Sequence, residues 1–336
     1  MFRRLSSAAA LLVATAAVAR AQGGSVSSQC QGSTLTALAA QDACQKSVDL
    51  FNYLAPQLGA LIAGGNVEPG QGGALGGPGH FGISVRATAL RSPLPQFDQV
   101  DVRLGAAQAS NIPVNTTTVA FPVADLAIGV FRGVPLGLTR VGGVDVLVNA
   151  TYVPTITRDA VSVRTNGSSV HLGFGARLGL IEESTLLPGV SVSVLRRETP
   201  TATITAATGD DSVGVSGTRV RTDSWRLTAA KRLVIVSLAA GIGQDRYRSA
   251  ATVSGVVNDA VAGVPFRAES SVDLVQTLTR TNVFANLTLL AIPFARVVGE
   301  VGRSSGGALA ATYNSLDGRR PDAAYTYASL GVRLGR

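Results

Sequence analysis

Residue types that commonly mark catalysis are scarce in this chain. Of its 336 residues, only two are histidine, two are cysteine, one is methionine and one is tryptophan. The histidines, cysteines and carboxylates do not show the spacing of a metal site, and no Gly-rich phosphate-binding loop is present. Ser191 and Ser193 are expected on the strand next to His171, but adjacency alone does not make a nucleophile and base. We therefore expect no catalytic residues, no metal and no cofactor.

Long hydrophobic runs are also missing after the first 21 residues. A helix needs about 20 consecutive apolar residues to cross a bilayer, yet the mean hydropathy is positive and charged residues make up only 15% of the chain. The apolar residues are spread thinly, which is typical of β-barrels. The formal charge of +8 comes mostly from dispersed arginines. Because no basic run contains interleaved aromatics, we expect no binding to nucleic acid.

The beginning of the chain has the pattern of a secretory signal peptide. Arg3 and Arg4 precede an apolar core from Ala8 to Ala19, and Ala19-Arg20-Ala21 fits a cleavage site. Residues 1–21 are therefore predicted to be removed from an exported protein. In an exported chain, Cys30 and Cys44 are predicted to form a disulfide, which would close a short loop and add about 3 kcal/mol of stability.

The clearest structural pattern is the alternation from Ser224 to Arg246. Apolar side chains occupy every second position there, and the positions between them hold glycine, hydroxyl side chains and Arg226. This period of two predicts two strands of a hairpin, with a turn slightly longer than two residues at Lys231-Arg232. One apolar face and one polar face indicate lipid outside and a polar lumen inside.

The same alternation recurs along the rest of the chain after residue 80. The predicted strands cover residues 80–91, 119–131, 144–152, 170–180, 190–197, the two strands of the hairpin at 224–243, and then 280–289, 294–302 and 325–336. Short connections alternate with long polar ones, as in a barrel with both ends in the periplasm. We predict an all-β fold, a transmembrane antiparallel up-and-down β-barrel of ten strands over residues 80–336. A further pair near Phe97 to Gly105 would extend the range to between eight and twelve.

Residues 22–79 differ from this pattern. Apolar residues at three- and four-residue steps predict a helix over 46–63, which Pro56 would kink or split. A Gly- and Pro-rich linker follows over 64–79. This disulfide-pinned segment is predicted to be a plug inside the lumen or a periplasmic collar, and a helix packed on the lower rim of the barrel is the simpler alternative.

The last strand, Tyr325 to Arg336, resembles the final strand of the Gram-negative outer-membrane β-barrel superfamily, although Arg336 stands where an aromatic residue is usual. The resemblance covers residues 80–336 as architecture. It implies a location in the outer membrane, contact with outer-membrane lipid and recognition by the outer-membrane assembly machinery. Aromatic anchors at the membrane boundary would be few, and we expect Trp225, Tyr152, Phe174, Tyr325 and Tyr327 to serve in this role.

Charged residues on the inward positions are the best candidates for a functional site. The predicted lumen-facing residues are Arg86, Asp125, Asp145, Arg177, Arg226, Arg296, Glu300 and Arg333. A ring of arginines would favour anionic solutes. Alternatively, the arginines pair with Glu300, Asp125 or the N-terminal Asp42 and Asp49, and fill a narrow barrel. Inward glycines (Gly173, Gly175, Gly179, Gly241 and Gly243) would make room for the N-terminal helix, a ligand or neighbouring side chains.

These features give two main functional hypotheses. The first is a transporter or channel for a small solute, hydrophobic or anionic, gated by the N-terminal segment, with a loose likeness to the plugged fatty-acid transporters of the outer membrane. The second is a structural or surface-interaction barrel without transport. A soluble exported protein would instead need its apolar faces buried between two sheets.

Overall fold

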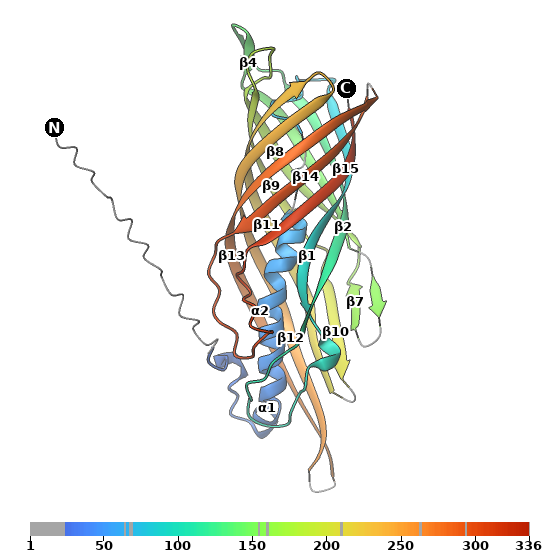
Figure 1. The fold of residues 1–336 in the computed structure, drawn as a ribbon. Coiled ribbons are helices and arrows are strands. Elements are labelled where there is room, and N and C mark those ends of the chain that lie inside the picture. The colour runs from blue at the N-terminus through green and yellow to red at the C-terminus, as the bar shows by residue number, and fades with distance from the viewer. Residues whose placement is uncertain are drawn as a thin grey trace, which may run out of the picture.

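The wall of the molecule is one closed antiparallel sheet (Figure 1). The computed structural model describes residues 24–63, 65–66, 70–153, 155–158, 161–208, 211–261, 264–292 and 294–335. The predicted signal peptide therefore lies outside the described residues. Ten strands follow one another around the ring, and it closes where β15 pairs with β1 and β11 pairs with β12. The predicted ten-stranded up-and-down barrel is confirmed.

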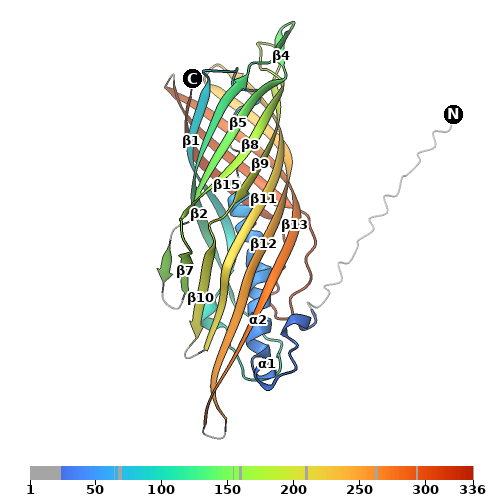
Figure 2. The ribbon, with the colours of Figure 1, turned by 180° about the vertical axis from the view of Figure 1, so that it is seen from behind.

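The ring strands differ greatly in length. They are β1 (Phe81–Pro95), β2 (Val114–Phe131), β5 (Gly143–Tyr152), β8 (Val170–Ile181), β9 (Gly189–Glu198), β11 (Asp211–Leu233), β12 (Val236–Val261), β13 (Val264–Ile292), β14 (Ala295–Ser305) and β15 (Tyr325–Gly335). A small hairpin of β3 (Val134–Leu136) and β4 (Thr139–Val141) connects β2 to β5. Outside the ring, β10 (Ala202–Thr208), β7 (Val161–Thr165) and β6 (Ile156–Arg158) pair in turn beside β11, as Figure 2 shows from behind.

Each ring strand alternates an exposed apolar side chain with a buried inward one. On β1, for example, Val85 is 59% exposed whereas the neighbouring Arg86 is 3% exposed. The apolar rows thus face away from the lumen and are not covered by a second sheet, which excludes the soluble two-sheet alternative. Over the lipid-facing band the sheet closes without an unpaired edge, so the backbone there can lie in lipid without unsatisfied hydrogen-bonding groups.

The apolar outer band ends abruptly on β11 and β12. The outward positions of β11 change from Ala229, Leu227 and Trp225 to Asp223 and Arg221, and those of β12 change from apolar residues to charged ones in the same way. Beyond this boundary β11, β12 and β13 continue as a polar extension of the wall, at the lower end of Figure 1. The extension lies at the end opposite the short connections, which is the external end in barrels of this type.

Two connections differ from the sequence prediction. The β11–β12 turn is a two-residue turn at Val234-Ile235, because Leu233 pairs with Val236. Lys231 instead lies on β11, where its Nζ donates hydrogen bonds to three carbonyls of the β8–β9 connection. The predicted long loop after residue 243 is also wrong, because β12 and β13 pair continuously across that region.

The region from Phe97 to Gly105 adds no strand to the barrel. It contains the 3₁₀ helix η2 (Phe97–Gln99) instead, and the ring stays at ten strands. Two of the predicted aromatic anchors are also wrong, because Tyr325 and Tyr327 face the lumen, and the Oη of Tyr325 lies 3.2 Å from the Oη of Tyr247. Tyr152, Phe174 and Trp225 do face outward, with 44%, 59% and 40% of their surfaces exposed.

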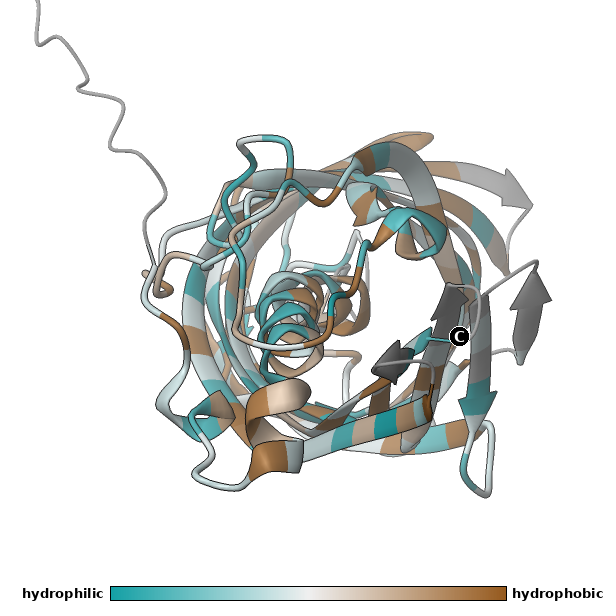
Figure 3. Ribbon diagram, turned by 90° about the horizontal axis from the view of Figure 1, so that it is seen from below, coloured by the Kyte–Doolittle hydropathy of each residue, from teal (hydrophilic) through white to brown (hydrophobic). Residues whose placement is uncertain are grey.

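The N-terminal helices lie at and within the external end of the barrel. They are η1 (Ser28–Cys30), α1 (Leu35–Ala39) and α2 (Gln41–Ala63). Seen along the barrel in Figure 3, α2 lies inside the ring of strands, not on its rim. It begins earlier than predicted and continues without a break through Pro56. From its end near the middle of the barrel, the chain runs on to β1 at the end with the short connections.

Candidate functional site in the barrel lumen

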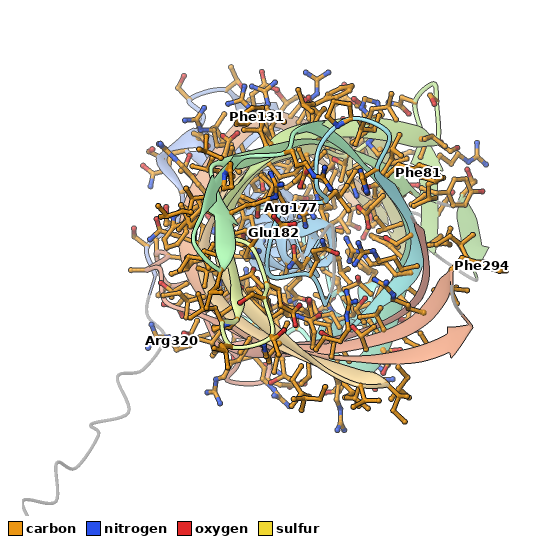
Figure 4. The ribbon with its side chains drawn as sticks, turned by 90° about the horizontal axis from the view of Figure 1, so that it is seen from above. Phe81, Phe131, Arg177, Glu182, Phe294 and Arg320 are labelled. Carbon is orange, nitrogen blue, oxygen red and sulfur yellow. A yellow bond between two sulfur atoms is a disulfide. The ribbon has the colours of Figure 1, made fainter. Side chains whose placement is uncertain are left out.

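The charged side chains predicted to face the lumen do point inward. Arg86, Asp125, Asp145, Arg177, Arg226, Glu300 and Arg333 are all buried, and Arg296 is half-buried at the mouth. Figure 4, which looks into the barrel from the end with the short connections, shows Arg177 within the lumen and Phe81, Phe131 and Phe294 at the periphery. The alternation of each strand places these residues inside because the opposite face meets lipid.

Three of the inward arginines pair with carboxylates on neighbouring strands. Arg86 Nε lies 2.7 Å from an oxygen of Asp125, and Arg177 Nη2 lies 2.7 Å from an oxygen of Asp145. Arg226 Nη1 lies 2.6 Å from Asp245 Oδ1. A buried arginine that is neutralised in this way contributes little positive potential to a pore. The arrangement therefore favours the paired alternative over a ring of arginines that selects anions.

Two arginines bind the carboxyl end of α2. Arg197 Nη1 and Arg226 Nη2 donate hydrogen bonds to the Ala63 carbonyl oxygen, over 3.1 Å and 3.4 Å. The last carbonyl groups of a helix lack partners within the helix and carry partial negative charge, so guanidinium groups there are stabilising. The inward charges thus position the plug helix as well as one another.

The sequence prediction missed Arg197 and Asp245. Arg197 has the same parity as the inward Ser191 and Ser193 on β9, and Asp245 has the same parity as the inward Gly243 on β12. Extending the alternation by one or two positions would have found both. Their partners could not have been found in this way, because the pairing depends on the register between strands.

The linker after α2 is held along the inner wall by its backbone. The Asn66 amide donates to both carboxylate oxygens of Glu300 over 3.2 Å, and the Leu75 amide donates to both oxygens of Asp145 over 3.1 Å. Arg333 Nη2 donates to Gln71 Oε1 over 2.6 Å. Asp145 and Glu300, which we predicted to face a solute, therefore bind the N-terminal segment in this structure.

Glycines allow the linker and the wall to approach closely. A Cβ atom on Gly72 would lie 2.3 Å from the Gly189 carbonyl oxygen, so a side chain would force the two backbones apart. Gly179 similarly leaves room for Ala74. The other inward glycines singled out in the sequence leave room for side chains of the wall, which are Arg197 beside Gly173, Leu195 beside Gly175, Phe284 beside Gly241 and Arg226 beside Gly243.

The external half of α2 is enclosed by an apolar core. Val48 and Phe51 pack with Val215, Val253 and Leu274 of the extended wall. The predicted disulfide between Cys30 and Cys44 is confirmed and joins η1 to α2. Apolar residues on the inner face of the extended wall explain why α2 stays in the lumen after the outer face has become polar.

Asp42 and Asp49 are occupied by partners other than the lumen arginines. Asp42 pairs with Lys46 at 2.5 Å, one turn further along α2. Asp49 accepts hydrogen bonds from the backbone and side-chain amides of Asn314 over 2.8 Å, in the external β14–β15 connection. Burial raises the pKa of Asp49 above its usual value, and the hydrogen bonds from Asn314 partly offset this effect. Neither carboxylate therefore pairs with the lumen arginines, which was one of the alternatives from the sequence.

An apolar cavity of about 270 Å³ lies between α2 and the wall. Its lining residues include Leu54, Leu58 and Leu61 of α2, together with Phe121 of β2 and Ile204 of β10. Within the described residues, β2 pairs with β5 only from Val123 to Phe131, so the external part of β2 has a neighbour on the β1 side alone. The cavity thus lies where the hydrogen bonding of the wall is interrupted.

A second cavity lies at the opposite end of the segment. It measures about 620 Å³ and is polar, with Lys231, Arg232 and Arg296 among its lining residues. The linker from Gly70 to Leu75 also lines it. The N-terminal segment therefore contributes to the walls of both cavities.

The described residues contain no group of three or more histidine, cysteine, aspartate or glutamate side chains that could hold a metal ion. Among the helices in the described ranges, none is long and apolar enough to cross a membrane. The absence of enzymatic activity and of a cofactor stays a prediction.

Comparisons with known proteins give similarity to solved structures alone. No family model matches the chain, and no curated protein matches it. The attachment invasion locus protein Ail of Yersinia pestis is 10% identical, with 77% of this chain and 99% of Ail covered, at a TM-score of 0.27. The beta domain of the Bordetella autotransporter BrkA is 13% identical (76% and 98% covered, TM-score 0.33), and the outer membrane protease OmpT of Escherichia coli is 10% identical (77% and 97% covered, TM-score 0.31).

The geometry of the wall indicates which class of protein the chain belongs to. The sheet is closed, its strands are antiparallel, and its outer face carries an apolar band bounded by charged residues. These are the properties that allow strands to cross a bilayer. The chain is therefore a closed antiparallel β-barrel with the geometry of a membrane-spanning barrel.

Proposed function

We propose that this barrel transports a small hydrophobic molecule, with the N-terminal segment as its gate. The observation that carries the proposal is the apolar cavity beside α2. Small-molecule sites are typically concave and apolar, and those for drug-sized ligands measure about 300–1,000 Å³. A cavity of about 270 Å³ suits a slightly smaller molecule.

The position of the cavity supports entry from the side. Its lining includes Val119 of β2 and Ala202 of β10, two strands that are not hydrogen-bonded to each other in the described structure. An apolar molecule that reaches the external edge of the apolar band would enter here without crossing the charged lumen. The charged pairs of the lumen would repel such a molecule from the direct axial route, because burying a polar or charged group against an apolar one is unfavourable.

The linker is the part of the segment that is best suited to move. Helix α2 is held by an apolar core, whereas the linker is held mainly by hydrogen bonds such as those of Asn66 and Leu75 to the wall. Water can replace hydrogen bonds at a modest net cost of about 1 kcal/mol each. Displacement of the linker would connect the lumen at the carboxyl end of α2 with the polar cavity at the end with the short connections.

Dye binding tests the site. The fluorescence of N-phenyl-1-naphthylamine, a small apolar dye, is titrated with the full chain in a non-ionic detergent. Ala202→Trp should fill the cavity and weaken binding at least tenfold, whereas Ala250→Trp, at an exposed outward position of β12, should leave binding unchanged. Equal binding by both variants would exclude the cavity as the site.

Conductance tests the gate. In planar bilayers the full chain should show little current, and a variant that lacks residues 22–79 should conduct. If neither form carries current and neither takes up the dye into vesicles, transport is excluded.

A specific observation favours the second candidate, a barrel that acts through its external surface. The extension of β11, β12 and β13 and the external β14–β15 connection are tied together through α2, since Asp49 contacts Asn314 and Val48 packs on the extended wall. Such a rigid external surface suits the binding of a partner. If neither the full chain nor the variant without residues 22–79 carries current, this function is favoured over transport.

A further inference from the structure

An outer groove lies at the external edge of the apolar band. It measures about 580 Å³ and is formed by outward side chains of β8, β9, β11 and β12. Trp225 lies beside Val194, and the next row outward holds Phe174, Arg196 and Arg246. The groove therefore combines an apolar floor with a basic margin.

Strand register shows how the groove is layered. Val194 pairs with Trp225, so these apolar side chains form one row across β9 and β11. In the next row outward, Asp223 pairs with Arg196 on one side and with Arg246 on the other. Rows on the same face are two residues apart, which is about 7 Å along a strand. The charged row thus lies about one headgroup width beyond the apolar row.

The acidic residues near the groove are already neutralised. Arg196 Nε lies 2.6 Å from Asp223 Oδ1. Further outward, Arg221 in the next row and Arg219 in the row after it lie 3.6 Å and 3.3 Å from the same Glu198 oxygen. These pairs leave an excess of positive charge on the outer face.

Two arginines of β12 carry that excess. Arg246 and Arg248 are exposed, and their guanidinium groups have neither an ion-pair nor a hydrogen-bond partner within the described part of the chain. They occupy successive outward positions and are therefore about 7 Å apart along the strand. Two guanidinium groups at this spacing can approach one phosphate from two sides, and each offers parallel donors that match phosphate oxygens.

We propose that this groove binds a phosphorylated lipid of the outer leaflet. An acyl chain lies over Val194 and Trp225 and passes Phe174 in the next row outward, and the phosphate lies between Arg246 and Arg248. The groove lies at the depth of the lipid headgroups, because aromatic side chains mark the boundary between the hydrocarbon and headgroup regions. Clustered basic residues beside that boundary attract anionic headgroups. A soluble phosphate would use the arginines but would leave the apolar floor uncovered. The occupant is therefore a lipid.

The chain contains a built-in probe, because Trp225 is its single tryptophan. Lipids with brominated acyl chains quench tryptophan fluorescence on contact. The full chain in non-ionic detergent is titrated with brominated phosphatidic acid, whose headgroup is an anionic phosphate, and separately with brominated phosphatidylcholine, whose headgroup has no net charge. We expect phosphatidic acid to half-quench Trp225 at a concentration at least ten times lower.

Substitutions test whether the preference for phosphatidic acid depends on Arg246 and Arg248. Each basic residue near a membrane surface contributes about 1 kcal/mol of attraction to anionic lipid, so the double variant Arg246→Gln/Arg248→Gln should lose the tenfold preference. Arg303→Gln, at an exposed outward position that follows Val301 on β14, is the matched control and should keep the preference. Millimolar inorganic phosphate should not relieve the quenching.

Three results would overturn the proposal. They are equal quenching by the two lipids, a preference that survives in the double variant, and a preference that Arg303→Gln abolishes to the same degree. Relief of quenching by millimolar inorganic phosphate would also overturn it, because the arginines would then bind phosphate without the acyl chain. A heat-modifiability gel confirms that each variant is folded before the titration.

Discussion

The pair formed by Arg226 and Asp245 gives the sharpest test of how the lumen is built. Both side chains are almost inaccessible, at 6% and 2% exposure, and Nη1 lies 2.6 Å from Oδ1. Asp245 also accepts hydrogen bonds from Asn282 Nδ2 over 2.7 Å and from Tyr247 Oη over 3.2 Å. The substitution Asp245→Asn keeps the shape of the side chain and removes its charge.

Removing one partner leaves a guanidinium buried without a counter-charge, which costs about 3–5 kcal/mol. Native domains are stable by only about 5–15 kcal/mol, so this is a large part of the total. Carbonyl oxygens of Trp225 and Ala63 remain near Arg226 and offset part of the loss. We therefore expect Asp245→Asn to lower the free energy of unfolding by about 3 kcal/mol.

The assay is unfolding by urea in detergent micelles, followed by the fluorescence of Trp225, which is adjacent to Arg226. The double variant Arg226→Met/Asp245→Leu removes both charges and should recover most of the lost stability, because buried pairs are often replaceable by apolar residues. A double-mutant cycle should then give a coupling energy of about 2 kcal/mol or more. If Asp245→Asn stays within about 1 kcal/mol of the parent chain, the lumen is wet at this level and the reasoning is refuted.

Three further predictions concern the N-terminal segment and the external loops. Replacing Cys30 and Cys44 by serine should remove about 3 kcal/mol of loop-closure stabilisation and speed protease cleavage of the segment before α2; unchanged cleavage would contradict this. Phe51→Ala should cost about 3–5 kcal/mol in urea unfolding, because the side chain is 2% exposed in the core between α2 and the wall; a loss below about 1 kcal/mol would show that α2 does not pack there. Hydrogen bonds, the largest from Asn111, lower the pKa of Asp317 below 3.8, so the carboxylate stabilises the folded loop fully above pH 3.8 and this contribution is lost as the pH falls through the lowered pKa. Protease sensitivity of that loop should rise in acid in the parent chain and should be independent of pH in this range in Asp317→Asn.

Within the lipid-facing band, the sequence was sufficient to predict the strands and their faces. There the outer face meets hydrocarbon and the inner face is polar, so every strand alternates strongly. The register of Val85 and Arg86 on β1, for example, follows from this contrast alone. The same parity placed the charged lumen residues correctly inside.

Beyond the band the contrast reverses, and this explains the main errors. On β12 the outward Arg246 and Arg248 meet water, whereas the inward Tyr247 and Ala251 pack toward α2. A strand with polar residues outside and apolar residues inside does not match the lipid-facing template, so the extension was predicted as a loop.

The contacts of the lumen were beyond local sequence reasoning. Arg226 pairs with Asp245 because β11 and β12 meet in one particular register, and both Arg226 and Arg197 reach Ala63 because α2 ends at that height. Neither fact is encoded in the spacing of residues along one strand. Tyr325 and Tyr327 are a different case, since they share the parity of the inward Arg333 and could have been placed inside by the alternation itself.

The position of the linker against the inner wall is the central claim, and a cysteine cross-link tests it most directly. A Cβ atom on Gly179 would lie 3.0 Å from the Cβ of Ala74, whereas one on Gly299 would have no neighbour within 4 Å. Disulfides need Cβ atoms about 3.5–4.5 Å apart, which small adjustments allow at the first site. The pair Ala74→Cys/Gly179→Cys should therefore oxidise spontaneously in the folded full chain, and Ala74→Cys/Gly299→Cys should not. If the first pair stays reduced under oxidising conditions, the N-terminal segment does not lie along the inner wall of this barrel.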